Sequence, residues 1–257
     1  MTLEMGLALA GFAIATGLAL GTLGAGGAIL AVPAFSYAAH LPHREASATS
    51  LLVVGTAALI GGLLTLRRCK NNPEEAKPDF KVALPFVLSG LVGSWGGALL
   101  SKHVPELALK LLFGAVVLAA AEAMYLRSTA SAQESSQKTA PAWLTPLIGL
   151  GAGLLTGLVG VGGGFMIVPA LTVVGKLSLK RASATSVWII AGNAAAALTG
   201  YIGKVHIAWG MAGAFLAVTL VAMSIGQRFA RHANPKTLQR LFAAFLLVIG
   251  IVTLIKR

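Results

Sequence analysis

Charged residues are scarce in this 257-residue sequence: they make up 11% of it, against 56% for hydrophobic residues. Soluble domains typically carry about 25% charged residues. Four stretches, residues 46–66, 82–101, 182–203 and 205–227, contain no Lys, Arg, Asp or Glu at all. Each reaches the roughly 20 residues that a helix needs to cross a bilayer. The composition therefore argues against a soluble fold and predicts a polytopic membrane protein.

Cysteine and acidic residues are also few. The single cysteine, Cys69, excludes an internal disulfide framework and a cysteine-rich metal site. Of the eight acidic residues, Glu122 alone is expected inside a span, where its side chain can also snorkel to the interface. Without buried carboxylates we expect no cation cage and no paired acids for hydrolysis. The sequence thus predicts no metal, no cofactor, no catalytic residues and a ligand of negative charge.

Basic residues outnumber acidic ones, giving a formal net charge of +12. Such an excess can indicate binding to nucleic acid, binding to a membrane surface, or the anchoring of cytoplasmic loops. The basic clusters at 67–81 and 228–240 lie between apolar segments, which favours loop anchoring in a lipid bilayer. No polar domain is available to hold nucleic acid, so we expect no such partner.

Two charge-free stretches, residues 5–43 and 139–175, are too long for one crossing. Each contains a glycine-rich run, at 21–27 and 157–164, where the helix is expected to break. We therefore expect ten hydrophobic helical segments, with bounds good to about four residues. They are 4–22, 28–40, 46–66, 82–101, 106–126, 142–159, 165–175, 182–203, 206–227 and 238–255.

The chain repeats itself. Residues 17–50 align with 153–186 without a gap, at an offset of 136, with identity at 15 of 34 positions. A weaker match at an offset of 129 pairs Gly97 with Gly226 and His103 with His232. The serine-rich stretch between the halves has the composition of a flexible linker. We predict a first transmembrane repeat at 1–126, a cytoplasmic linker at 127–141 and a second transmembrane repeat at 142–257.

Five crossings per half would place the two halves in opposite orientations. The excess of Lys and Arg in cytoplasmic loops tests this. With 67–81 inside, the inside segments hold 14 basic residues and the outside ones 6. The predicted fold is therefore all-α and polytopic, with two inverted repeats and both termini in the periplasm; a homodimer is left open.

The glycine runs are candidate anion cradles, because a glycine-rich turn that opens a helix presents free N–H groups and the positive end of the helix dipole. Inside a membrane, non-helical backbone survives where it lines a cavity or is buried in protein. We expect the short helices after the breaks to begin at mid-depth and converge from opposite sides. Close helix packing is the alternative role for such glycines. The candidate ligand-lining glycines are Gly24, Gly26, Gly27, Gly160, Gly162, Gly163 and Gly164.

Polar side chains near the breaks complete the candidate site. Thr49 with Ser50, and Thr185 with Ser186, occupy equivalent positions in the two halves. Their hydroxyls can donate to an anion or bond the preceding helical turn, and the sequence does not decide between these roles. Asn193 lies within a span and can face a solute path or bond a neighbouring helix.

The doubled glycine run carries a family resemblance. Gly24-Ala-Gly-Gly with Pro33, and Gly160-Val-Gly-Gly-Gly with Pro169, are each followed by Ala-Ser-Ala-Thr-Ser. This pattern resembles the TauE/SafE family of sulfite exporters and sulfonate permeases over nearly the whole chain, although Ala28 departs from a triple glycine. The resemblance implies a secondary transporter of small sulfur-containing anions in the bacterial inner membrane. We expect the breaks and hydroxyl pairs to bind the anion between halves that alternate access; a passive anion channel is the alternative.

Overall fold

The computed structural model describes residues 3–24, 27–71, 76–129, 144–159, 164–173 and 175–232, together with positions 234, 237, 240, 241, 243, 244, 247, 248 and 251. The described residues contain helices and no strand, which confirms the all-α class. The helices are α1 (Leu3–Leu23), α2 (Ala28–Pro33), the π-helical turn η1 (Ala34–Ala38), α3 (His43–Asn71), α4 (Phe80–Leu100), α5 (Glu106–Thr129), α6 (Leu144–Val159), α7 (Gly164–Val173), α8 (Leu179–Tyr201) and α9 (Trp209–His232).

The bounds of these helices lie close to those expected from the sequence, with two exceptions; the tenth expected segment, 238–255, lies mostly outside the described residues. α3 ends at Asn71 rather than near 66, and α9 ends at His232 rather than near 227. Arg68 and Lys70 stand in the last turn of α3. Basic side chains favour a helix C-terminus because they complement its partial negative charge. The helix therefore continues beyond the apolar stretch, and part of the expected 67–81 loop is helical.

The helices pack through glycine. The most extensive contacts join α4 to α6 and α1 to α9. A Cβ added at Gly93 would overlap the Leu150 carbonyl of α6, and one at Gly17 would overlap the Thr219 carbonyl of α9. Small residues let two membrane helices bring their backbones together in this way. Each close pair combines one helix from each half of the sequence.

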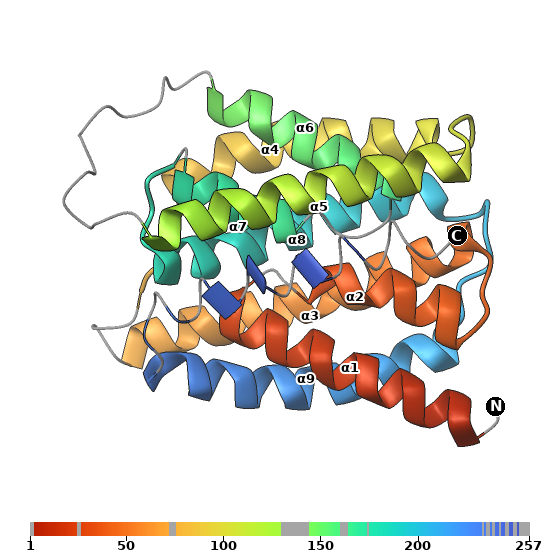
Figure 1. The fold of residues 1–257 in the computed structure, drawn as a ribbon, viewed down its shortest axis with the longest axis horizontal. Coiled ribbons are helices and arrows are strands. Elements are labelled where there is room, and N and C mark those ends of the chain that lie inside the picture. Colours follow the sequence, from red (N-terminus) through yellow and green to blue (C-terminus); the bar gives the residue numbers. More distant parts are fainter. Residues whose placement is uncertain are drawn as a thin grey trace.

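The two close pairs are equivalents under the repeat. α1 corresponds to α6 and α9 corresponds to α4, so the α1–α9 contact has its counterpart in the α6–α4 contact. Figure 1 shows these pairs at opposite edges, with α3 and α8 between them. In the same view α1 and α6 run in opposite directions, as do α3 and α8. Such opposite courses are expected of inverted repeats; their orientation in a membrane, and the boundaries of the two repeats, stay predictions.

Within the part of the chain that the structure describes, five helices are long and apolar enough to cross a membrane: α1 from Glu4 to Leu23, α3, α4, α8, and α9 from Trp209 to Ala230. Large apolar side chains lie exposed along them, including Leu84 and Val92 on α4 and Val221 and Phe229 on α9. An apolar outer surface of this extent is suited to lipid and poorly suited to water. The fold is that of a multi-pass membrane protein.

Candidate functional site

The first glycine break is closed onto α8. Gly24 has φ +76°, a left-handed conformation that favours glycine, and its N–H donates to the Leu20 carbonyl at 2.9 Å. A Cβ at Gly24 would overlap Ser183, and the Ser186 hydroxyl donates to the Gly24 carbonyl at 3.1 Å. The end of α1 is therefore sealed against the other half of the protein.

The remaining residues of this break are partly described. Gly27 is buried, and a Cβ there would overlap the Thr16 carbonyl of α1, so this glycine serves close packing in the present state. Gly26, expected to line a ligand, lies outside the described residues.

The second break is described only at its flanks. Gly160, Gly162 and Gly163 lie outside the described residues, whereas Gly164 is buried and begins α7. The last residue of α6, Val159, accepts a hydrogen bond from the buried Ser47 hydroxyl of α3 at 3.1 Å. Ser47 is the repeat equivalent of Ser183. Each Ala-Ser-Ala-Thr-Ser block therefore contacts the helix end that precedes the other half's glycine break.

The two threonines bind backbone at helix starts. Thr185 accepts a hydrogen bond from the Asp79 N–H, just before α4, at 2.9 Å. Thr49 accepts one from the Ala208 N–H, just before α9, at 3.4 Å. Asp79 and Ala208 are equivalents at the offset of 129, so each half caps the same helix start in the other half. In this state both threonine hydroxyls make structural contacts between the halves.

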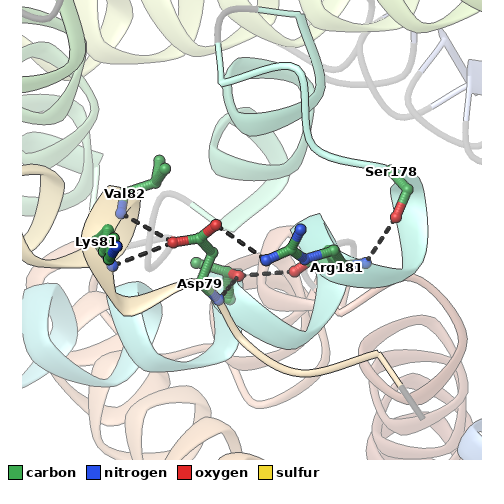
Figure 2. Close-up of polar contacts among 6 residues, drawn as sticks. Asp79, Lys81, Val82, Ser178 and Arg181 are labelled. Atoms are coloured by element: carbon green, nitrogen blue, oxygen red, sulfur yellow. Dashed lines mark hydrogen bonds and ion pairs between the residues drawn. The ribbon is translucent and has the colours of Figure 1, made fainter. Parts of the chain in front are cut away.

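An exposed ion pair is present at one of these two ends. Figure 2 shows the Asp79 carboxylate accepting hydrogen bonds from the Lys81 and Val82 N–H groups, at 3.1 and 3.3 Å, and pairing with Arg181 at 3.1 Å. Ser178 caps α8 beside it. Because the Arg181 side chain is 49% exposed, the pair contributes little, under about 1 kcal/mol. Ala208, the equivalent of Asp79 at the other end, has an uncharged side chain and cannot form such a pair.

The two hydroxyl pairs lie at opposite ends of the α3–α8 pair. A Cβ added at Gly55 would lie 2.9 Å from the Ala194 Cβ, and one at Gly62 would lie 2.9 Å from Trp188, so the helices pack antiparallel. Ser50 and Ser186 are then about 13 residues apart along the pair, or about 20 Å at 1.5 Å per residue. Our expectation that the two breaks converge at mid-depth is therefore not met by their described residues, because each lies near the start of a different antiparallel helix.

Asn193 occupies the middle of the bundle. It is fully buried near the centre of α8, and neither its amide nitrogen nor its amide oxygen has a hydrogen-bond partner. The amide packs against Gly90 of α4 so closely that a Cβ there would overlap it. The hydroxyls of Ser94, Ser50 and Thr16 are likewise buried and without a partner. Such unsatisfied groups are rare in folded proteins and call for an explanation.

A separate groove lies between α3 and α8. Its volume is about 410 Å³, and its lining is mostly Leu, Ala and Gly, with Thr56 and Trp188 as the polar exceptions. Asn193 does not line it. The groove and the buried amide are therefore different features of the same helix pair.

Three polar residues of the helix interfaces, Ser47, Ser94 and Tyr201, were not singled out from the sequence. Ser47 belongs to the repeated Ala-Ser-Ala-Thr-Ser block, which was the available signal. Ser94 is one of three serines in the charge-free stretch 82–101, and no motif distinguishes it. The Tyr201 hydroxyl donates to the Gly157 carbonyl at 2.9 Å and lies 3.2 Å from the Ser101 hydroxyl, joining α8 to α6 and to the end of α4. Among the residues that the structure describes, no three His, Cys, Asp or Glu side chains are grouped to hold a metal ion.

Comparison with known proteins gives one family. The family model described as sulfite exporter TauE/SafE matches residues 7–253. A probable membrane transporter protein of Xylella fastidiosa is 24% identical, covering 98% of this chain and 95% of its own length. YdhB of Bacillus subtilis, also named a probable membrane transporter protein, is 26% identical over 83% of this chain and 85% of its own. A protein of the same description from Methanocaldococcus jannaschii is 28% identical, covering 92% of this chain and 91% of its own length. No solved structure matches the chain at a significant level.

Proposed function

We propose that this chain, which belongs to the TauE/SafE family of sulfite exporters, is a secondary transporter that moves small sulfur-containing anions, such as sulfite and sulfonates, across the bacterial inner membrane. The family and the names of the relatives fit the broader role of a membrane transporter. The substrate class and the mechanism of alternating access are the parts that we add.

The observation that carries the proposal is the buried amide of Asn193. A polar side chain left without a partner in the middle of a membrane bundle is costly, and such groups commonly mark the path of a polar solute. The interior of α4 and α8 around it, residues 82–101 and 182–203, contains no charged residue. A neutral donor can hold an anion without binding it so tightly that release becomes slow.

The glycine breaks are proposed as the two gates of this path. One gate is closed here by the Ser186–Gly24 hydrogen bond, and the other by the Ser47–Val159 bond. They lie at opposite ends of α3 and α8, with Asn193 between them. The close pairs α1–α9 and α4–α6 would move as units against α3 and α8, opening one gate at a time.

In this scheme the candidate ligand-lining residues act in series along the path. When a gate opens, its hydroxyls and backbone N–H groups are freed to meet the anion. The residues proposed for the first gate are Gly24, Gly26, Gly27, Thr185 and Ser186, and those for the second are Gly160, Gly162, Gly163, Gly164, Thr49 and Ser50.

The charges of the two ends support an orientation. The end where α3 and α9 finish and α4 and α8 begin carries exposed basic side chains, including Arg67, Lys70, Lys81, Arg181 and Arg228. The ends of α3 and α9 are joined there by an Arg68–Gln227 hydrogen bond of 2.6 Å. Since cytoplasmic surfaces carry the excess of Lys and Arg, we assign this end to the cytoplasm and both termini to the periplasm.

The experiment is uphill flux in proteoliposomes. Purified protein, given an anion or proton gradient, should accumulate labelled sulfite or a sulfonate against its own gradient. Gly163→Leu should abolish this flux. Gly210→Leu serves as the control, because Gly210 is exposed and has open space around its Cβ position. Flux that only dissipates gradients would establish a passive channel instead, and absence of flux for every sulfur anion tested would overturn the substrate class.

A further inference from the structure

Asn193 is a position at which the two halves of the repeat differ in chemistry. Its equivalent in the first half is Ala57, which is fully buried in α3. The same helix position is therefore filled by a small apolar side chain in one half and by an amide in the other. An amide that served only to join helices would be hydrogen-bonded to a neighbour, and this one is not. Packing alone thus gives no reason for asparagine at this position.

The surroundings of the amide are small and neutral. Gly90 of α4 faces it, and any side chain at Gly90 would occupy the space of the amide. Ser94 lies one turn further along α4, where its hydroxyl is also buried and without a partner. α4 and α8 run parallel here, since Gly200 of α8 packs on Ala98 of α4. Asn193 and Ser94 are thus within about one helical turn, roughly 5 Å, of each other along this interface.

An amide differs from other neutral polar groups because it has two donor hydrogens and an accepting oxygen. Both ends of Asn193 lack partners. A ligand that satisfied the whole group would therefore bring an acceptor and also a donor. A sulfonate or sulfite oxygen supplies the acceptor; a hydroxyl on the same ligand supplies the donor.

We infer, on the basis of the transport function proposed above, that Asn193 selects anions that carry a hydrogen-bond donor beside the oxyanion, with Ser94 as a second contact. The preferred ligands are singly charged: hydrogen sulfite, or a sulfonate with a neighbouring hydroxyl. A dianion such as sulfite itself brings a second charge into a neutral, dry interface and leaves the Asn193 oxygen without a donor. An analogue lacking the donor leaves the same oxygen unpaired and is rejected for that reason.

The test compares two sulfonates of nearly equal size and equal charge, 2-hydroxyethanesulfonate and 1-propanesulfonate, which differ by a hydroxyl in place of a methyl. Each competes with labelled sulfite for uptake into proteoliposomes at one fixed pH, so that proton coupling affects both alike. The hydroxylated compound should inhibit at about tenfold lower concentration, the effect of one hydrogen bond. Equal inhibition, or stronger inhibition by 1-propanesulfonate, would overturn the inference without any variant.

Two variants assign the preference to the residue. Asn193→Leu keeps the branching and the number of side-chain heavy atoms and removes the amide, so the tenfold preference should disappear. Thr199→Val is the matched control on the same helix, because Thr199 is exposed and its hydroxyl bonds only to the Ala196 carbonyl of its own turn. This variant should keep the preference. A preference that survives in Asn193→Leu would assign the selection elsewhere and refute the role of Asn193. If no sulfur anion is transported by the unaltered protein, it is the proposed function that fails, and the two failures are thereby distinguished.

Discussion

Replacing Gly97 by alanine should loosen the contact between α4 and α6. A Cβ at Gly97 would overlap the Leu154 carbonyl and lie 2.9 Å from the Leu158 nitrogen, whereas ordinary contacts begin at 3.4 Å. The two helices must then separate by about 0.5–1 Å, which forfeits roughly a quarter to a half of each dispersion contact along the interface. Overpacking of this kind typically costs about 1–3 kcal/mol.

The neighbouring glycine supplies the control. Gly96 is on the same helix, but a Cβ there would meet nothing within 4 Å. Gly96→Ala should gain up to about 1 kcal/mol in helix propensity. Both variants are purified in detergent and their unfolding is followed by differential scanning fluorimetry.

The expected melting temperatures follow from these energies. For a chain of this size 1 kcal/mol shifts Tm by about 2–4 °C, so Gly97→Ala should melt about 2–12 °C below the unaltered protein. Gly96→Ala should melt no lower than the unaltered protein. The same Tm for the two alanine variants would refute the backbone contact between α4 and α6 and, with it, their movement as one unit.

Three further outcomes are expected. Gly24→Ala and Gly203→Ala both place alanine at φ +76°, a strain of about 1–2 kcal/mol, but only at Gly24 would the new Cβ overlap α8. The yield of monodisperse protein in size-exclusion chromatography should therefore fall further for Gly24→Ala than for Gly203→Ala. Equal yields would contradict the closed gate. Asp79→Asn keeps an N-cap and loses only the exposed pair with Arg181, whereas Asp79→Ala also loses the cap. Asp79→Ala should therefore melt below Asp79→Asn, by the equivalent of about 1 kcal/mol. The reverse order of melting temperatures would be inconsistent with the capping geometry. A reporter that is active only in the periplasm should be active when fused after Arg257, and activity of a cytoplasmic reporter there would invert the assigned orientation.

The helices could be predicted from the sequence because their signals are local. Charge-free stretches of about 20 residues, bounded by Lys, Arg or glycine, mark spans directly. The ends of α3 and α9 were placed too early because basic residues end an apolar stretch without ending a helix. The change from α- to π-helix after Pro33 likewise had no signal beyond the proline itself.

The roles of the polar residues could be predicted only in part. Thr49 and Thr185 were recognised by their repetition, but their partners, Ala208 and Asp79, are more than 100 residues away. No local pattern reports such a pairing. The two repeat offsets do relate these partners to each other, so the symmetry held information about the caps. Asn193 could be named from its place in a span, whereas its lack of any partner required coordinates.

Each close helix pair combines one helix from each half of the sequence, and this has a consequence for biosynthesis. α1 is made before α9, nearly 200 residues earlier, so the glycine-lined surface of α1 that packs on α9 lacks this partner until α9 has been made. The order of assembly is therefore opposite to that of a protein whose domains mature one after another. The α1–α9 contact, and with it the native bundle, can therefore close only after α9 has been made.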